Sequence, residues 1–142
     1  MAIIQTQCTV FKLNLLKGLE NFTATSPYVY KIALYNGNAS LDASTTAYTT
    51  TNEITGTGYT AGGKVLTPIA PNSDNNNNTA YLSFDNVTWS PASFTTSGAL
   101  IYNSTTDAAV FVLNFGNTKT SANSFTITFP VNGSTTAVIR IS

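Results

Sequence analysis

The sequence predicts a mainly β protein: a single-domain antiparallel β-sandwich, jelly-roll or Ig-like, with one short N-terminal helix. Beyond Pro27, apolar residues alternate or run in short blocks rich in β-branched and aromatic side chains, which is typical of strands. Turn signals separate these blocks. The length of 142 residues fits one domain with one core. Many short strands divided in this way favour a sandwich.

The one helix is expected at residues 9–18. Thr9 can cap its N-terminus, and Gly18 is suited to end it because glycine readily adopts the left-handed conformation of a C-terminal cap. Apolar residues recur along this segment and just past its end at a spacing of four: Phe11, Leu15 and Leu19.

The segment before the helix has two interpretations. Ile3 and Ile4 have no obvious hairpin partner in the sequence. Residues 1–8 therefore form either an N-terminal arm that contacts a partner or a strand inside the same sandwich. Under the first interpretation Ile3 and Ile4 belong to an assembly interface, and both interpretations remain open from the sequence.

Seven strands are expected after the helix. They lie at residues 28–35, 64–67, 81–89, 98–102, 108–115, 124–129 and 137–141. The turn signals are Asn36-Gly37, Gly62-Gly63, Phe115-Gly116-Asn117 and Asn132-Gly133. Residues 71–79, which contain a run of four asparagines, are expected to form an exposed polar loop. No linker or repeat divides the chain, so residues 1–142 are expected to be one domain.

The charge content argues against nucleic-acid binding. Only 8% of residues are charged, and six basic side chains balance six acidic ones. Lysines that are scattered singly cannot form the basic stripe that neutralises phosphates. A near-neutral surface also gives little repulsion between copies, which suits a protein packed into an assembly.

The sequence also indicates where the protein is made. Cys8 is the only cysteine, so no internal disulfide can form, which fits synthesis inside the cell. The N-terminus lacks a basic region followed by an apolar stretch, and no segment approaches the length of a membrane span. We expect neither export by a signal peptide nor contact with a membrane.

The residue inventory predicts that the chain is not an enzyme and has no cofactor or metal. Histidine, the usual general base and the commonest metal ligand, is absent. The available carboxylates are singly spaced and mostly adjoin turns, without the D-x-D-x-D spacing of a calcium loop. They are Glu20, Asp42, Glu53, Asp74, Asp85 and Asp107.

Two glycine-rich matches to nucleotide-binding motifs are incomplete. Residues 58–64 match G-x-x-x-x-G-K, but Val65 stands where a phosphate-binding loop needs Ser or Thr, and a proline-rich segment replaces the helix. Residues 56–61 match G-x-G-x-x-A without the strand and helix that this fingerprint requires. The expected structure is a glycine-rich loop that leads into a strand.

The aromatic residues have a structural and a functional interpretation. Alternating aromatics in strands usually pack in the core or between subunits, and they can also stack on sugars. Trp89 is the first candidate for a core or interface anchor. The tyrosines concerned are Tyr28, Tyr30, Tyr48, Tyr59, Tyr81 and Tyr102.

Several blocks of the chain resemble a family of small virion structural proteins of tailed bacteriophages. The resemblance covers the whole chain, from FKLNLLKG near the N-terminus to AVIRI at the C-terminus. It lies in YKIALY (residues 30–35), TNEITGTGYT (51–60), GALIY (98–102) and VLNFG (112–116).

This resemblance implies a capsid decoration, or cement, protein. Such a protein binds the major capsid protein, sits as a homotrimer on the outer surface of the virion, reinforces the shell and is made in the host bacterial cytoplasm. A tail, adaptor or fibre component, and a carbohydrate-binding module displayed on the particle, are the alternatives.

Overall fold

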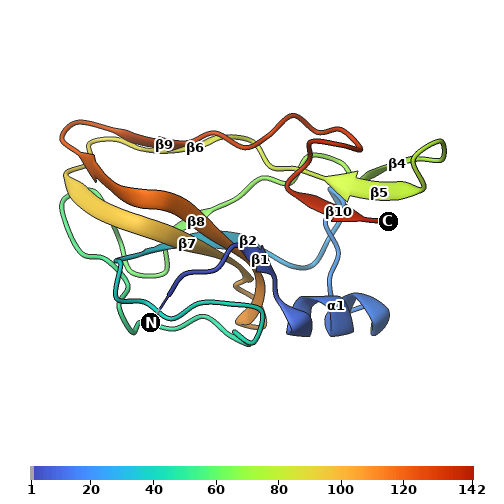
Figure 1. The fold of residues 1–142 in the computed structure, drawn as a ribbon, viewed down its shortest axis with the longest axis horizontal. Helices are drawn as coiled ribbons and strands as arrows, with labels where there is room; N and C mark the ends of the chain where they lie inside the picture. Colours follow the sequence, from blue (N-terminus) through green and yellow to red (C-terminus); the bar gives the residue numbers. More distant parts are fainter. Residues whose placement is uncertain (1) are drawn as a thin grey trace.

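Two β layers face each other in the computed structural model, which describes residues 2–142 (Figure 1). One layer is a five-stranded antiparallel sheet with the order β1-β8-β7-β2-β3. Its strands are β1 (Thr6–Gln7), β8 (Ala108–Ser121), β7 (Phe94–Asn103), β2 (Tyr30–Tyr35) and β3 (Lys64–Val65).

The second layer consists of two smaller antiparallel sheets. One pairs β6 (Val87–Trp89) with β9 (Phe125–Ile127). The other has the order β10-β5-β4 and contains β10 (Ile139–Ile141), β5 (Thr79–Leu82) and β4 (Asn72–Asp74). The protein is 41% strand and 6% helix, which confirms the prediction of a mainly β, single-domain fold with a sandwich arrangement.

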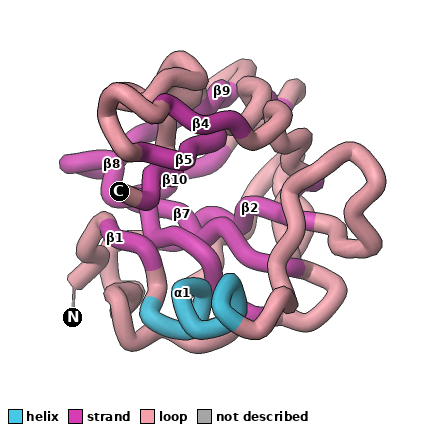
Figure 2. Tube along the Cα trace, turned by 90° about the vertical axis from the view of Figure 1, so that its right-hand side faces the viewer, coloured by secondary structure: helices cyan, strands magenta, loops and turns pink. Residues whose placement is uncertain are grey.

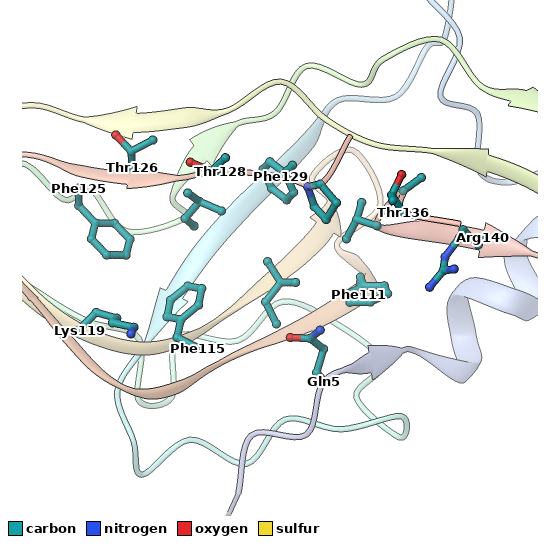
Figure 3. A pocket seen from close by; sticks show the side chains of 15 residues that line it. Gln5, Phe111, Phe115, Lys119, Phe125, Thr126, Thr128, Phe129, Thr136 and Arg140 are labelled. Carbon is teal, nitrogen blue, oxygen red and sulfur yellow. The ribbon is translucent and has the colours of Figure 1, made fainter. Parts of the chain in front are cut away.

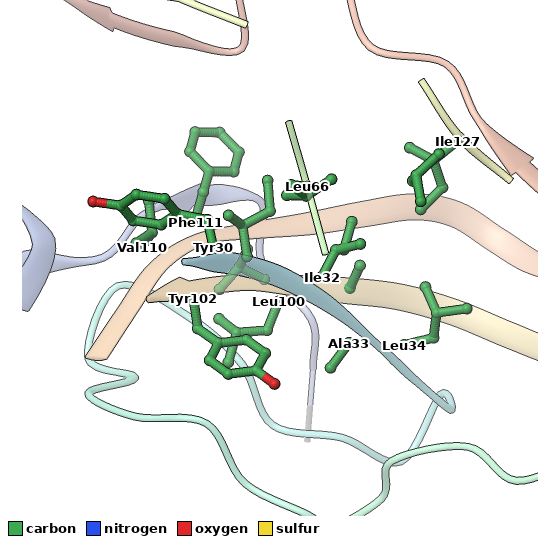
Figure 4. Close-up of a cluster of buried hydrophobic side chains, with 14 of the residues drawn as sticks. Tyr30, Ile32, Ala33, Leu34, Leu66, Leu100, Tyr102, Val110, Phe111 and Ile127 are labelled. Carbon is green, nitrogen blue, oxygen red and sulfur yellow. The ribbon is translucent and has the colours of Figure 1, made fainter. Parts of the chain in front are cut away.

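The central strands of the large sheet are covered on both faces. β2 and the second half of β7 are almost continuously buried instead of alternating, as expected for strands without a solvent-facing side. Side chains of these strands project to both sides of the sheet in Figure 4. Helix α1 and loops lie on the face away from the second layer (Figure 2). Tyr102, which points away from the second layer in Figure 4, stacks on Tyr48 with ring centroids 4.7 Å apart.

Helix α1 (Thr9–Leu16) is shorter than expected and begins one residue after Cys8, which takes the cap position without a side-chain cap bond. The predicted cap Thr9 is thus the first helical residue, and that part of the prediction was wrong. The predicted stop is confirmed: Gly18 has φ 71°, and the amides of Gly18 and Leu19 donate to the carbonyls of Leu15 and Asn14. No helix in residues 2–142 is long and apolar enough to cross a membrane.

The N-terminal segment is part of the sandwich. The amide of Ile4 donates to Leu41 O at 2.8 Å, and the amide of Leu41 donates to Ala2 O at 3.0 Å. Thr6 and Gln7 then pair with β8. The interpretation of residues 1–8 as a free arm is therefore wrong for residues 2–8, and Met1 lies outside the described residues.

Two strand predictions needed correction. The expected strand at residues 81–89 is divided into β5 and β6, which belong to different sheets. The predicted turn at Phe115-Gly116-Asn117 lies instead within β8, where the pairing shifts from Thr96↔Lys119 to Gly98↔Asn114. Gly116 has φ 84° and its amide donates to Asn114 Oδ1. Residues that usually form a turn therefore form a bulge here, and β8 continues beyond it.

The prediction of a loop at residues 71–79 also needs correction, because most of this segment forms a β-hairpin. β4 pairs with β5, leaving only residues 75–78 as the turn. Asp74 Oδ1 accepts the amide of Asn76, and Ser134 Oγ donates to Asp74 Oδ2 at 2.6 Å. Local side-chain bonds of this kind stabilise a tight turn in a sequence that looks like low complexity.

Candidate functional site

The three interface candidates do not form one surface. Trp89 is only 2% exposed, and its ring packs against Phe94 and Phe125 at 6.3 and 6.0 Å. It is therefore a core anchor and presents no area to a partner. Ile3 is half-buried against the core, whereas Ile4 is 54% exposed.

Glu20 is a carboxyl group inside the protein, 8% exposed. Its Oε1 accepts hydrogen bonds from Tyr30 Oη at 3.0 Å and from Asn103 Nδ2 at 2.8 Å. Its Oε2 has no partner in the described part of the chain. Burial raises the pKa of Glu20 above its usual value, although the bonds from Asn103 and Tyr30 act against this shift. This group joins the segment after α1 to the end of β7.

Glu53 is the centre of a tyrosine cluster that the sequence did not reveal. Tyr48 Oη donates to Glu53 Oε1 at 2.6 Å, and Tyr59 Oη donates to Glu53 Oε2 at 2.5 Å. Tyr59 Oη also accepts the amide of Leu34 in β2. The pKa values of the Tyr48 and Tyr59 phenols are raised, mainly by burial and next by the hydrogen bond that each makes to Glu53. Both phenols therefore stay neutral and act as hydrogen-bond donors. The cluster fastens the loop of residues 36–62 to the large sheet.

The half-buried residues Asp42 and Asp74 stabilise local turns through their carboxylates. Ser44 donates to Asp42 through its amide and its hydroxyl, and Asp74 binds the hairpin turn described above. These hydrogen bonds lower the pKa of each aspartate. Within residues 2–142, no group of three or more Cys, Asp or Glu side chains is placed to hold a metal ion.

The glycine-rich segment that matches part of a phosphate-binding loop packs against β2. Gly63 has φ 81°, and a Cβ at this position would lie 1.8 Å from Ile32 O. Strand β3 follows directly, so the lysine of the motif lies in a sheet and not at a helix N-terminus. Lys64 Nζ donates to Thr88 O and lies 5.9 Å from the Trp89 ring. The segment links the two layers.

A cleft opens between the two layers and has a volume of about 500 Å3 (Figure 3). Its lower wall is β8 and its upper wall is β9 with the chain that follows, through Pro130. Alternate residues of each wall point into it, as the period of a strand requires. These apolar residues are Phe111, Leu113 and Phe115 from β8, and Phe125, Ile127 and Phe129 from the opposite wall.

Two cations flank this apolar cleft. Lys119 lies toward one end and Arg140 toward the other (Figure 3). No carboxylate is among the described residues that line the cleft. Mostly apolar walls with a few polar groups at defined positions are the usual form of a binding site.

A second apolar feature lies on the outer side of α1. Leu16 is 88% exposed, and Leu13 and Leu19 are 46% and 44% exposed. Leu13 and Leu16 are three residues apart on the helix and are therefore neighbours on its surface, and Leu19 follows the turn at Gly18 just beyond it. We call this set the leucine face.

Sequence reasoning missed the cleft and the leucine face. The signal for the cleft was present as two runs with period two, F-V-L-N-F and F-T-I-T-F, but their facing arrangement depends on the fold of the whole chain. The helix periodicity drew attention to Phe11, which is buried, and away from Leu13 and Leu16 on the other side.

No known protein family, curated protein or solved structure matches this chain. The class that its geometry defines is a small antiparallel β-sandwich protein with one short helix.

Proposed function

We propose that this protein is a structural component of a tailed-bacteriophage virion, and specifically a capsid decoration protein that binds the major capsid protein and stabilises the shell. It acts as a homotrimer on the outer surface of the capsid. The observation that carries the proposal is the leucine face, an apolar patch held on a rigid and nearly uncharged β body. Contiguous exposed apolar surface on a small protein is typical of an interaction site.

The leucine face is suited to attach to another protein through the apolar surface area that the contact would bury. Burying apolar surface contributes about 25 cal/mol per Å2, and association entropy offsets part of this gain. Many weak contacts repeated over a shell add to a large total, so a small sandwich with few charges can reinforce an assembly. The resemblance of the sequence to phage virion proteins is what supports the capsid as the partner.

A tail, adaptor or fibre component is the second candidate within the same class. Its fold and its apolar contacts would be the same, and only its number of copies and its position in the particle would differ. The balance of six basic and six acidic residues favours neither position.

A carbohydrate-binding role receives no support from five of the seven candidate aromatic residues. Trp89, Tyr30 and Tyr102 are buried and cannot stack on a sugar. Tyr48 and Tyr59 use their hydroxyl groups to bind Glu53 inside the fold. Sugar binding at these residues would require the core to open.

Reconstruction of the purified particle by cryo-electron microscopy tests the proposal. We expect threefold clusters of this sandwich on the capsid, in fixed ratio to the major capsid protein. A few copies at one vertex would identify a tail or adaptor component instead. Absence of the protein from the particle would refute a virion role.

A further inference from the structure

Unpaired strand edges border the cleft between the layers. In the described part of the chain, β1 pairs only with Phe111 and Val112 of β8, so the outer side of β8 has no strand partner from Leu113 to Ser121. The amides of Asn114 and Gly116 are bonded by the side chains of Gln5 and Asn114, and the open edge follows them, from Asn117 to Ser121. On the opposite wall β9 pairs with β6 alone.

Free backbone groups at such an edge are a template for another strand. Natural edge strands are often protected by proline, by several charges or by a bulge. Beyond the bulge at Gly116, the edge of β8 contains no proline and only one charged residue, Lys119. Phe115 and Phe125, which meet across the cleft at 6.0 Å, remain only half-buried. The edge and the apolar walls therefore lie at the same opening.

We propose that this cleft receives an extended polypeptide segment of a partner protein, which adds as a strand along the free edge of β8. Its apolar side chains, at every second position, insert between the layers against Phe115 and Phe125. Acidic residues near its two ends pair with Lys119 and Arg140. The inference goes beyond the capsid role, because it concerns a second surface and does not depend on which virion protein supplies the segment.

Three observations favour a strand over a single-chain amphipathic anion such as a fatty acid. The apolar wall residues repeat with the period of a strand. The open edge offers N–H and C=O groups, which an alkyl chain cannot bind. Cations flank the cleft near both ends, as Figure 3 shows, whereas a fatty acid carries one anionic head.

Synthetic peptides that differ in the charge of their terminal residues, or in the order of their residues, test the proposal directly. The probe is the capped nine-residue peptide ETVTVTVTE, whose length matches the nine positions from Leu113 to Ser121. The controls are the basic counterpart KTVTVTVTK, the block peptide EVVVTTTTE of the same composition, and dodecanoate. Binding is followed by NMR titration and by amide hydrogen exchange of β8.

Charge reversal in the cleft supplies the matched variant. Lys119→Glu combined with Arg140→Glu reverses both cations, and both side chains are exposed, so the fold should tolerate the change. Lys12→Glu combined with Lys17→Glu makes the same change of net charge on and beside α1, away from the cleft. We expect the cleft variant to bind ETVTVTVTE roughly tenfold more weakly and KTVTVTVTK correspondingly better. The α1 variant should bind like the wild type.

Protection of β8 amides by ETVTVTVTE, and the exchange of charge preference, would support strand addition. Equal binding of the block peptide, or no protection of β8 by either alternating peptide, would overturn it. Dodecanoate that shifts the Phe115 and Phe125 signals while the peptides do not would identify an amphiphile site instead. None of these outcomes depends on the virion, so failure here leaves the capsid proposal standing, and absence from the particle leaves this one standing.

Discussion

Glu20 is the residue whose ionisation should govern the pH dependence of stability. Its pKa is raised in the folded protein because burial disfavours the charged form. Below the ordinary pKa of a glutamate, Glu20 is protonated in both the folded and the unfolded state, so burying it costs no charge desolvation. As pH rises from that value through the raised pKa of the folded state, the folded state loses stability. Glu20→Gln keeps an oxygen for Tyr30 and Asn103 but removes the charge.

We thus expect Glu20→Gln to raise the free energy of unfolding relative to wild type at pH 8 more than at pH 4. Urea unfolding at both pH values measures this difference. An effect of the same size at the two pH values would show that Glu20 keeps an ordinary pKa.

Gly63 is held at a close contact that only glycine allows. A Cβ would lie 1.8 Å from Ile32 O, and φ is 81°. Gly63→Ala should lower the free energy of unfolding by more than about 2 kcal/mol, because backbone must move. Gly116→Ala is the matched control: φ is 84° but no atom lies within 4 Å, so only backbone strain of about 1 kcal/mol remains. Similar losses for both variants in chemical unfolding would contradict the close approach.

At the scale of elements, the sequence predicted which segments are strands better than where they begin and end. β2 was expected because a short apolar run between turns is typical of a buried strand and is too short for a helix. The hairpin of β4 and β5 was missed because it is made by Asp74 and asparagines, whose side chains stabilise the turn but carry no apolar period. The bulge in β8 was read as a turn because Gly116 suits both.

The loop of residues 36–62 should depend on the Glu53 cluster for its order. Tyr59→Phe removes the donor to Glu53 and the acceptor for the Leu34 amide, and we expect a loss of about 1–2 kcal/mol in unfolding free energy. Amide hydrogen exchange in this loop should become faster. Tyr81→Phe, in β5, is the control. Unchanged exchange in the Tyr59→Phe protein would mean that apolar packing alone holds the loop.

At the scale of the whole molecule, the cleft and the leucine face could not be predicted from local pattern. Each wall of the cleft is a recognisable run of alternating residues, but which runs face each other follows from the strand order β1-β8-β7-β2-β3 and the divided second layer. The absence of histidine was readable directly and shaped the expectation of a structural role. These are the two surfaces through which we propose that the molecule contacts other proteins.

The leucine face should contribute to attachment and little to folding. Leu16→Lys places a charge on a side chain that is 88% exposed, so stability should change by less than about 0.5 kcal/mol. Binding to isolated capsid shells, measured by co-sedimentation, should weaken severalfold because a charge is buried at the contact. Val131→Lys, at a valine that is 78% exposed and outside the leucine face, is the matched control. Equal binding by both variants would exclude the leucine face from the contact.

The central claim is that this sandwich reinforces a capsid, and the thermal stability of the shell tests it most directly. Expanded shells of the major capsid protein that lack this chain would be melted with and without saturating purified protein. The account predicts binding at a fixed ratio to the capsid subunits and a higher temperature of shell disruption, because a ligand that binds only the intact assembly stabilises it. Shells that neither bind the protein nor change their melting temperature would contradict the decoration role.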